Sequence, residues 1–284
     1  MGNERLGAYG FRLVLPRHEK ELPNLSPVPE DALDVAFEWR HASVLVERNE
    51  LDSEAVLAGE KGADSLEVRR NPPSITLGFA EQTTPEALVH PLLTGPMSIL
   101  ARWRGDLTLH AGAFFADDRA WAVMGEREAG KSTALAQLAA RGCPLLADDL
   151  LVLDEGIVRA GPSCIDLRPD VAARAEGALA LGEIGGRPRY RLPTSHGPAR
   201  AELAGFFLMS WGHDPAVSIE QVPASEALKI VYEQEYIGLM GPADPGKVLD
   251  LLGVPMWRVR RPADWSFTEE TAEKMLEITG ESAT

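Results

Sequence analysis

Hydrophobic and polar residues alternate over short runs in the first hundred positions, a pattern typical of β-strands separated by turns. Prolines cluster between these runs, within residues 16–29 and again at 72–73. Because proline is rare inside paired strands, the clusters mark turns. The pattern therefore predicts a small β-rich N-terminal portion, with strands at residues 9–15, 35–39, 43–48, 66–69 and 74–79.

Residues 84–104 change to the spacing of a helical face. Pro91 and Pro96 fall inside this segment, and we expect both to break or kink the helix. A domain boundary is expected here, between a β-rich portion at 1–104 that recognises a substrate or peptide and a second domain at 105–284. The apolar positions that define the face are Leu88, Leu92, Leu93, Met97, Leu100 and Trp103.

From residue 106 the pattern becomes strand, turn, strand, glycine loop, helix and strand, which predicts an α/β (α+β) fold. Gly142 is expected to end the helix, because a helix end favours a residue that tolerates positive φ. Strands are predicted at 107–115, 120–124, 145–147, 203–211, 217–222 and 255–260, and helices at 132–141, 224–233 and 269–278.

Composition limits the functions that this fold can serve. The chain has 284 residues, of which 45% are hydrophobic, enough to form a proper core. A net charge of −15 argues against nucleic acid and anionic membranes as partners. The absence of a secretion-like start or long apolar span predicts a cytoplasmic protein. Two cysteines, Cys143 and Cys164, are too few for a disulfide framework and are expected to be buried thiols.

The sequence from Gly125 to Ser132 matches the phosphate-binding motif G-x-x-x-x-G-K-[ST] between an apolar strand and a helix. The glycines allow the backbone N–H groups to surround a phosphate, and the helix N-terminus adds positive charge. Lys131 is expected to reach the β- and γ-phosphates of a nucleotide, with the Ser132 hydroxyl on Mg²⁺. The predicted nucleotide contacts are Gly125, Glu126, Arg127, Glu128, Ala129, Gly130, Lys131, Ser132 and Thr133.

Glu126 and Glu128 are unusual in a phosphate-binding loop, and we expect their side chains to point outward with Arg127 offsetting part of their charge. Asp148 and Asp149 follow the next apolar strand, which we expect to adjoin the strand before the loop. Two adjacent acids can divide the work: one binds Mg²⁺ and the other accepts a proton from an incoming hydroxyl.

His110 follows residues 107–109 in the first strand predicted for this region. Small residues come after it and leave room for a ligand, so we assign His110 to the site. The remaining histidines lack the spacing of metal ligands and are interpreted as surface or structural residues: His18, His41, His90, His196 and His213. Three arginine-bearing segments either assist an anionic acceptor or the γ-phosphate, or lie on a solvated face. They contain Arg168; Arg187, Arg189 and Arg191; and Arg258, Arg260 and Arg261.

The order of His110, the 125–132 loop, the helix end at 140–142 and the acids at 148–149 resembles the catalytic domain of HPr kinase/phosphorylase. The resemblance implies a phosphoenolpyruvate-carboxykinase-like P-loop kinase core, with ATP and Mg²⁺ phosphorylating a hydroxyl. It implies that one of Asp148 and Asp149 is the general base, with Asp149 preferred, and that Ser132 and Asp148 bind the metal. His110 would then support the phosphate and metal site.

Two departures from that family narrow the resemblance. Acidic residues occupy loop positions where the family has a small residue and glycines, and the family's later glutamate-arginine-glycine signature is missing. The layout is similar to shorter HPr-kinase-related proteins associated with ribosomally made peptides, including the lasso-peptide tailoring kinases. That likeness implies a serine hydroxyl on a precursor peptide as the acceptor.

We therefore expect an ATP- and Mg²⁺-dependent kinase that acts on a hydroxyl, that of serine in a peptide or protein. The sequence is compatible with a monomer or a homo-oligomer. One alternative is a non-catalytic nucleotide-binding scaffold, motivated by Glu126 and Glu128. Another is a small-molecule kinase of the same fold. A carboxykinase-like enzyme is disfavoured, because the sequence shows no extra histidine and lysine ligands for a transition metal beside the aspartates.

Overall fold

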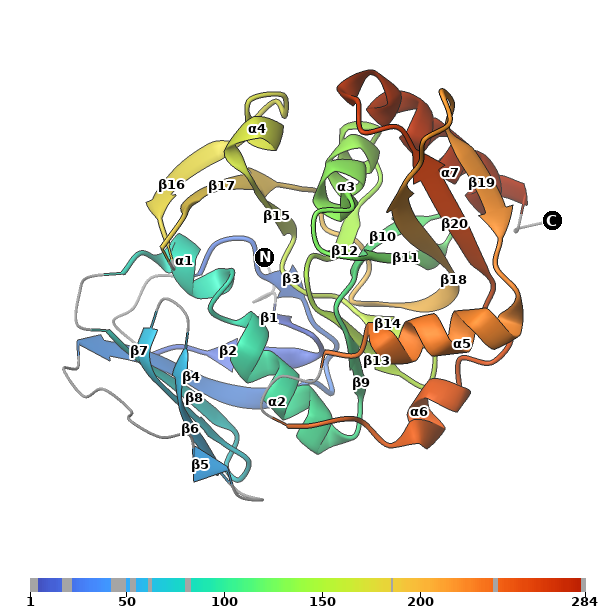
Figure 1. Cartoon of the computed structure of the whole chain (residues 1–284). Coiled ribbons are helices and arrows are strands. Elements are labelled where there is room, and N and C mark those ends of the chain that lie inside the picture. The colour runs from blue at the N-terminus through green and yellow to red at the C-terminus, as the bar shows by residue number, and fades with distance from the viewer. Residues whose placement is uncertain are drawn as a thin grey trace.

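The structure is a computed structural model that describes residues 5–16, 22–41, 50–51, 55–60, 63–79, 83–184, 186–236 and 240–281. The strand predicted at 43–48 lies outside these residues. Strands of the described ranges form three sheets, with helices packed between and over them (Figure 1). This arrangement confirms the predicted mixed α/β class. No helix in these ranges is both long and apolar enough to cross a membrane.

The first sheet has eight strands in the order β3-β1-β2-β4-β8-β7-β6-β5. The strand predicted at 9–15 is confirmed as β2 but starts later, because Tyr9 and Gly10 have positive φ angles of 54° and 76° and form a turn between β1 and β2. The strands are β1 (Leu6–Ala8), β2 (Phe11–Val14), β3 (Ser26–Pro27), β4 (Leu33–His41), β5 (Glu50–Leu51), β6 (Ala55–Glu60), β7 (Ala63–Arg69) and β8 (Ser74–Phe79).

Two helices, α1 (Pro85–Val89) and α2 (Thr94–Arg104), follow the first sheet. Pro91 lies between them, as the sequence predicts. The break predicted at Pro96 is wrong, because this proline lies in the first turn of α2, where a backbone N–H has no partner inside the helix. Buried side chains of both helices pack into the core of the first sheet.

The second sheet has nine strands, seven of them in the order β12-β10-β11-β18-β14-β13-β9, while β20 pairs with β18 and β19. Strands β11, β18 and β20 run parallel to one another, and the other pairs are antiparallel. The strands are β9 (Leu107–Leu109), β10 (Gly112–Ala116), β11 (Arg119–Gly125), β12 (Leu145–Ala147), β13 (Leu151–Asp154), β14 (Ile157–Arg159), β18 (Arg200–Trp211), β19 (Ser218–Gln221) and β20 (Met256–Arg261).

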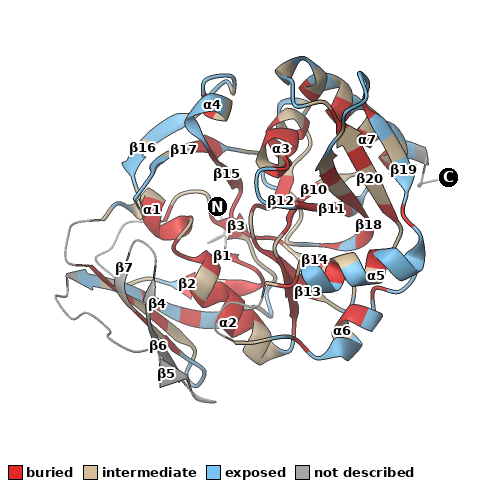
Figure 2. Cartoon of the chain, viewed as in Figure 1, coloured by how far each residue is buried: buried red, intermediate tan, exposed pale blue. Residues whose placement is uncertain are grey.

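Helices cover both faces of the second sheet, so that its centre is buried (Figure 2). Trp121 and Val123 of β11 belong to the core on one face, and Ala122 and Met124 to the core on the other, as strand alternation requires. Helices α3 (Lys131–Ala140) and α7 (Thr268–Glu281) pack on the first of these faces. The 3₁₀ turn η1 (Trp265–Phe267) directly precedes α7. Helices α5 (Ala224–Glu233) and α6 (Pro245–Leu249) pack on the second.

The single strand predicted at 107–115 is also wrong, because the chain changes partners at His110. Strand β9 pairs with β13, whereas β10 pairs with β11 and β12. Between them the backbone N–H of His110 donates to the carbonyl of Gln234 at 2.7 Å. The break places His110 at the junction of two groups of strands.

A third sheet, which the sequence pattern does not predict, has the order β15-β17-β16. It consists of β15 (Cys164–Leu167), β16 (Leu179–Glu183) and β17 (Pro188–Pro193), and the short helix α4 (Pro169–Ala172) follows β15. Ile165, Leu167 and Leu192 from this sheet share a core with buried residues of α3. The sheet therefore lies against the helix that follows the glycine loop.

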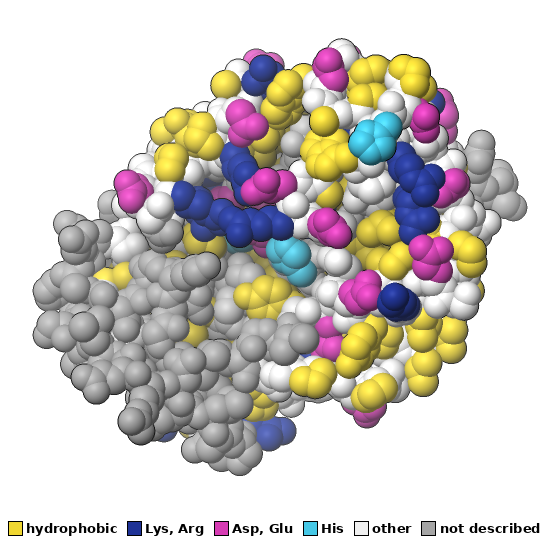
Figure 3. Space-filling view, viewed as in Figure 1, with side chains coloured by type: hydrophobic (Ala, Val, Ile, Leu, Met, Phe, Trp, Pro, Cys, Tyr) yellow, Lys and Arg dark blue, Asp and Glu magenta, His cyan; other side chains and the backbone are white. Residues whose placement is uncertain are grey.

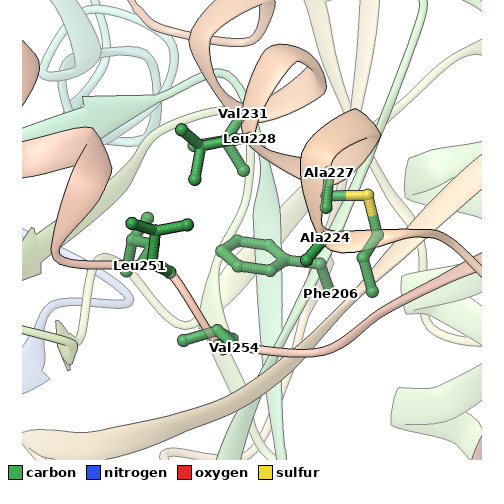
Figure 4. A pocket seen from close by; sticks show the side chains of 10 residues that line it. Phe206, Ala224, Ala227, Leu228, Val231, Leu251 and Val254 are labelled. Atoms are coloured by element: carbon green, nitrogen blue, oxygen red, sulfur yellow. The ribbon is translucent and has the colours of Figure 1, made fainter.

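An apolar cavity lies beneath α5, away from the glycine loop (Figure 4). Phe206, Val231 and Leu251 are among the side chains that line it, and the lining contains no titratable residue. A cavity without polar groups cannot orient a reaction. The candidate functional residues lie instead at the ends of β11, β12 and β15.

Candidate functional site

The loop between β11 and α3 has the curled backbone that its glycines predict. Gly125 and Gly130 have φ angles of 142° and 93°, which residues with a side chain rarely adopt. A Cβ atom on Gly125 would lie 2.5 Å from the carbonyl oxygen of Met209, and one on Gly130 would clash with the guanidinium of Arg261. Both positions therefore need glycine, and the loop leads directly into the N-terminus of α3, where unpaired N–H groups favour anions.

Lys131 is buried at the start of α3, and its ammonium group contacts the loop itself. Nζ donates to the carbonyl of Gly125 at 2.8 Å and to that of Glu126 at 3.1 Å. Burial lowers the pKa of Lys131, while Asp149 and Asp148 act in the opposite direction. The two aspartates therefore lie within electrostatic range of this lysine. Ser132 is half-buried and Thr133 buried in the same first turn.

The acidic residues of the loop point outward, as the sequence predicts. Glu126, Arg127 and Glu128 are all exposed. The carboxylate of Glu128 lies 2.9 Å from the guanidinium of Arg168, closer than the 4.0 Å to that of Arg127. Arg168 is therefore the main partner of Glu128, which leaves the inner side of the loop to the backbone.

Asp148 and Asp149 follow β12 and differ in exposure: the Asp148 side chain is 5% exposed and that of Asp149 39%. Oδ2 of Asp148 accepts a hydrogen bond from the backbone N–H of Asp166 at 3.0 Å. Burial raises the pKa of Asp148 well above its usual value, and the charges of Asp149 and Asp166 add to the rise. Asp149 has a positive φ of 62°, which turns the chain away from β12.

The strand that delivers these acids is not a neighbour of the strand before the loop, which corrects one expectation. Strand β12 pairs with β10, and β10 lies between it and β11. The glycine loop and the aspartate pair still lie in one region, because the charges of Asp149 and Asp148 act on the pKa of Lys131.

His90, at the end of α1, joins the aspartates. Its Nε2 atom lies 3.6 Å from Oδ2 of Asp148, 3.7 Å from Oδ2 of Asp149 and 4.0 Å from Oδ2 of Asp166. Its Nδ1 atom lies 3.3 Å from the hydroxyl of Thr94. The expectation that no further histidine lies beside the aspartates is therefore wrong. Atoms of His90, Asp148 and Asp149 are close enough together to bind one metal ion.

Arg191, on β17, fixes the surroundings of this cluster. Its buried guanidinium donates to Oδ1 of Asp166 at 3.0 Å, to the carbonyl of His90 at 2.6 Å and to that of Glu86 at 2.8 Å. The other oxygen of Asp166 accepts from Arg189 at 3.2 Å. The side chain of Arg191 thus joins the third sheet to α1, and both oxygens of Asp166 have a partner.

His110 contacts the backbone of the aspartate pair. Its Nδ1 atom lies 3.1 Å from the carbonyl oxygen of Asp149. Because a carbonyl can only accept, Nδ1 carries the proton and donates it. His110 is half-buried, and this contact positions Asp149. The structure thus brings His110, Lys131, Asp148 and Asp149 into one region.

Comparison with known proteins adds little beyond this geometry. No family model matches the chain, and no curated protein matches it. Among solved structures, the HPr(Ser) kinase/phosphatase from Coxiella burnetii is similar. The match has 16% identity and a TM-score of 0.29, and covers 61% of this chain and 98% of that one.

Arginine side chains gather beside the loop and the aspartates. Burial lowers the pKa of Arg187, and the charges of Arg189, Arg127 and Arg168 lower it further, whereas Asp149 acts in the opposite direction. These four arginines, which we call the arginine rim, are therefore near neighbours. Figure 3 shows basic side chains beside acidic ones and a histidine on this face. Arg168 and Arg189 are paired with Glu128 and Asp166, so the net positive charge of the rim comes mainly from Arg127 and Arg187.

The other arginine segment, on β20, divides in two. Arg258 and Arg260 are paired with Glu220, at 3.6 and 2.6 Å, and Arg258 also with Glu226 at 2.5 Å. Their charge is therefore already compensated on the surface. Arg261 is buried, stacks on Trp211 at 4.4 Å and lies beside Gly130. It is the member of this segment that adjoins the phosphate-binding loop.

Sequence reasoning missed three residues of the site: His90, Asp166 and Arg191. His90 carries no motif, and Asp166 lies on a strand of the unpredicted third sheet. Arg191 was singled out only as part of a basic run. No local pattern separates Arg191 from Arg187 and Arg189, because strand alternation says nothing about which charged side chain finds a buried partner.

Proposed function

We propose that this protein is an ATP- and Mg²⁺-dependent kinase that phosphorylates a hydroxyl group, a serine of a peptide or protein. The observation that carries the proposal is the glycine loop, in which Gly125 and Gly130 adopt positive φ and Lys131 begins α3. The charges of Asp149 and Asp148 act on the pKa of this lysine. A phosphate-binding lysine on one side and a carboxylate pair on the other are the parts that phosphoryl transfer needs, since its catalysis is mainly positioning and charge stabilisation.

Gly125 and Gly130 allow the loop to surround the phosphates with backbone N–H groups, and α3 adds the positive end of its dipole. Lys131 exchanges its contacts with the carbonyls of Gly125 and Glu126 for the β- and γ-phosphates when nucleotide binds. Mg²⁺ neutralises charge on the phosphates, and Ser132 and Asp148 are the residues that would bind it. The carboxylate of Asp148 is buried and fixed by the N–H of Asp166, as a metal ligand should be.

Asp149 is the general base in this proposal. Its carboxylate is 39% exposed, so an incoming hydroxyl can reach it, whereas that of Asp148 is 5% exposed. A base must lie within hydrogen-bond reach of the proton that it removes. His110 supports this role, because its Nδ1–H donates to the carbonyl of Asp149 and orients that residue.

The arginine rim supports an acceptor with acidic groups near its hydroxyl. Arg127, Arg168 and Arg187 are exposed, and Arg187 is the member whose pKa the charge of Asp149 affects. A precursor peptide of a ribosomally made natural product, such as a lasso peptide, is the acceptor that we propose from the sequence resemblance. Residues 1–104 would recognise it by strand addition at an edge of the first sheet, whose described edge strands are β3 and β5. We propose a cytoplasmic location for this reaction.

The acceptor class is tested by incubating the protein with ATP, Mg²⁺ and candidate peptides that carry one serine. Mass spectrometry should show a gain of about 80 Da on that serine, the mass of a phosphoryl group. A matched peptide with alanine in place of the serine should gain nothing. Phosphorylation of small hydroxyl compounds but of no peptide would favour the small-molecule kinase instead.

A nucleotide-binding scaffold is the second candidate, and two features of the glycine loop favour it. Lys131 contacts the carbonyls of its own loop, and Glu126 and Glu128 place negative charge at the rim of that loop. These features weaken nucleotide binding without preventing it. ATP binding without transfer to any peptide or small molecule would select this candidate over the kinase.

A further inference from the structure

The imidazole of His90 is buried with one nitrogen unpaired. The side chain is 4% exposed, and Nε2 has no hydrogen-bond partner. Its nearest acidic atoms, at 3.6 and 3.7 Å, lie beyond hydrogen-bond distance. A buried polar atom without a partner is costly in a folded protein, so its position needs an explanation.

That nitrogen faces the carboxylates of Asp148 and Asp149. Oδ2 of Asp148 accepts one hydrogen bond, from the N–H of Asp166, and keeps a second lone pair for a cation. Asp166, the third acid nearby, has both oxygens engaged by Arg191 and Arg189. Asp148 and Asp149 each direct Oδ2 toward His90, at 3.6 and 3.7 Å. Two adjacent carboxylates of like charge repel each other. A divalent cation between the three side chains would remove both the repulsion and the unpaired nitrogen.

The spacing fits one ion. Ligands at right angles around an ion with bonds of about 2.1 Å lie about 3.0 Å apart, and opposite ligands lie about 4.2 Å apart. The distances from Nε2 of His90 to the carboxylates of Asp148 and Asp149 fall between these limits. All three ligand atoms lie within 4.8 Å of one another. Small side-chain movements are therefore enough to complete the site.

His90 is oriented before any ion arrives. Arg191 donates to its carbonyl at 2.6 Å, and Thr94 lies 3.3 Å from its Nδ1. When Nδ1–H donates to the hydroxyl of Thr94, Nε2 presents its lone pair to the carboxylates. Metal-binding histidines commonly use the other ring nitrogen in this way.

We propose that His90, Asp148 and Asp149 form a binding site for a divalent transition-metal ion, with one nitrogen and two oxygen ligands. An imidazole favours transition metals over Mg²⁺, which prefers oxygen ligands. Asp149, whose side chain is 39% exposed, would bind the ion through Oδ2 and keep its second oxygen for an acceptor. This inference deepens the proposed kinase function and rests on it for the ion's role, but binding itself needs no nucleotide.

The test uses Mn²⁺ with the full chain in the absence of nucleotide. Electron paramagnetic resonance measures how much Mn²⁺ is bound, and electron spin echo envelope modulation detects a nitrogen atom bonded to it. We expect one tightly bound Mn²⁺ per chain with a nitrogen coupling. His90→Gln should remove that coupling and weaken Mn²⁺ binding at least about 10-fold. His213→Gln, which changes an exposed histidine, should alter neither.

His110→Gln removes the other histidine near the aspartates and keeps the assignment testable if His90→Gln fails to fold. A nitrogen coupling that survives in His110→Gln supports the site; one that disappears there overturns it. Absence of Mn²⁺ binding, or Mn²⁺ bound without nitrogen, also overturns it. Phosphoryl transfer from ATP to a serine peptide in the presence of Mg²⁺, measured separately, shows whether the proposed kinase function stands when this inference fails.

Discussion

Arg191 fixes the position of His90 through the backbone: its guanidinium donates to the His90 carbonyl at 2.6 Å. The same group binds Asp166, whose N–H in turn donates to Asp148. Arg191 therefore supports the aspartate cluster indirectly, through its hydrogen bonds to Asp166 and to the carbonyl of His90.

Replacing Arg191 with methionine should destabilise the fold strongly. The change leaves the buried carboxylate of Asp166 with Arg189 as its remaining partner, and leaves the carbonyls of His90 and Glu86 without this donor. Loss of one partner of a buried ion pair costs about 3–5 kcal/mol in the free energy of unfolding. Urea denaturation followed by circular dichroism measures this difference.

Arg119→Met is the matched control for that experiment. Arg119 is paired with Glu202 at 3.4 Å, and both side chains are well exposed. An exposed pair contributes about 0–1 kcal/mol, so the control should unfold close to the original protein. Equal losses for the two variants would mean that the buried network around Asp166 is not a major source of stability.

The glycine loop and the aspartate pair could be predicted because their signals are local. Gly125, Gly130 and Lys131 form a contiguous motif whose backbone requirements follow from residue type, and Asp148 follows a short apolar strand. Helix α5 was predicted with its observed ends at 224 and 233, since its apolar spacing is regular. The signals for these segments all come from neighbouring positions in the sequence.

The rest of the site depends on contacts that no local pattern encodes. His90 lies near the aspartates because α1 is joined to the third sheet. Arg191 of that sheet makes the connection, by donating to the carbonyl of His90. The break at His110 is invisible in the apolar run because each half of it pairs with a different strand. Long-range pairing decided these positions, whereas residue preferences alone pointed to one continuous strand.

His110→Ala should reduce phosphoryl transfer without abolishing it. The change removes the hydrogen bond to the carbonyl of Asp149 and so loosens a positioning contact, while leaving Lys131 and the carboxylates intact. We expect a loss of about 1–2 kcal/mol in transition-state binding, or about 10-fold in kcat/KM. In His110→Asn the side-chain amide can still donate, so part of the activity should return. An unchanged kcat/KM in His110→Ala would remove His110 from the site.

Cys164 should make the fold less stable at alkaline pH. Burial raises the pKa of this thiol from 9.0 to about 12, so the folded state keeps the proton that the unfolded chain releases above pH 9.0. The unfolded state then binds fewer protons, and stability falls as pH rises, by up to about 1.4 kcal/mol per pH unit for this group.

Comparison with Cys164→Ala isolates this effect, because the variant loses packing at every pH but lacks the thiol's titration. Its free energy of unfolding should fall less steeply between about pH 9 and pH 11 than that of the original protein. Cys143→Ala, at a half-buried position whose pKa is also raised, should show a smaller difference in slope. Parallel slopes for Cys164→Ala and the original protein would refute the assignment.

The central claim is tested most directly by transfer of label from γ-³²P-ATP to a serine peptide. With Mg²⁺ present, the protein should label the peptide, whereas Lys131→Met should lose about 3 kcal/mol of transition-state binding or more, at least about 100-fold in rate. Asp149→Asn should lose transfer while still binding ATP, because its carboxylate acts on the acceptor. Transfer that survives in both variants, or that is absent from the original protein with every acceptor tried, would contradict the account.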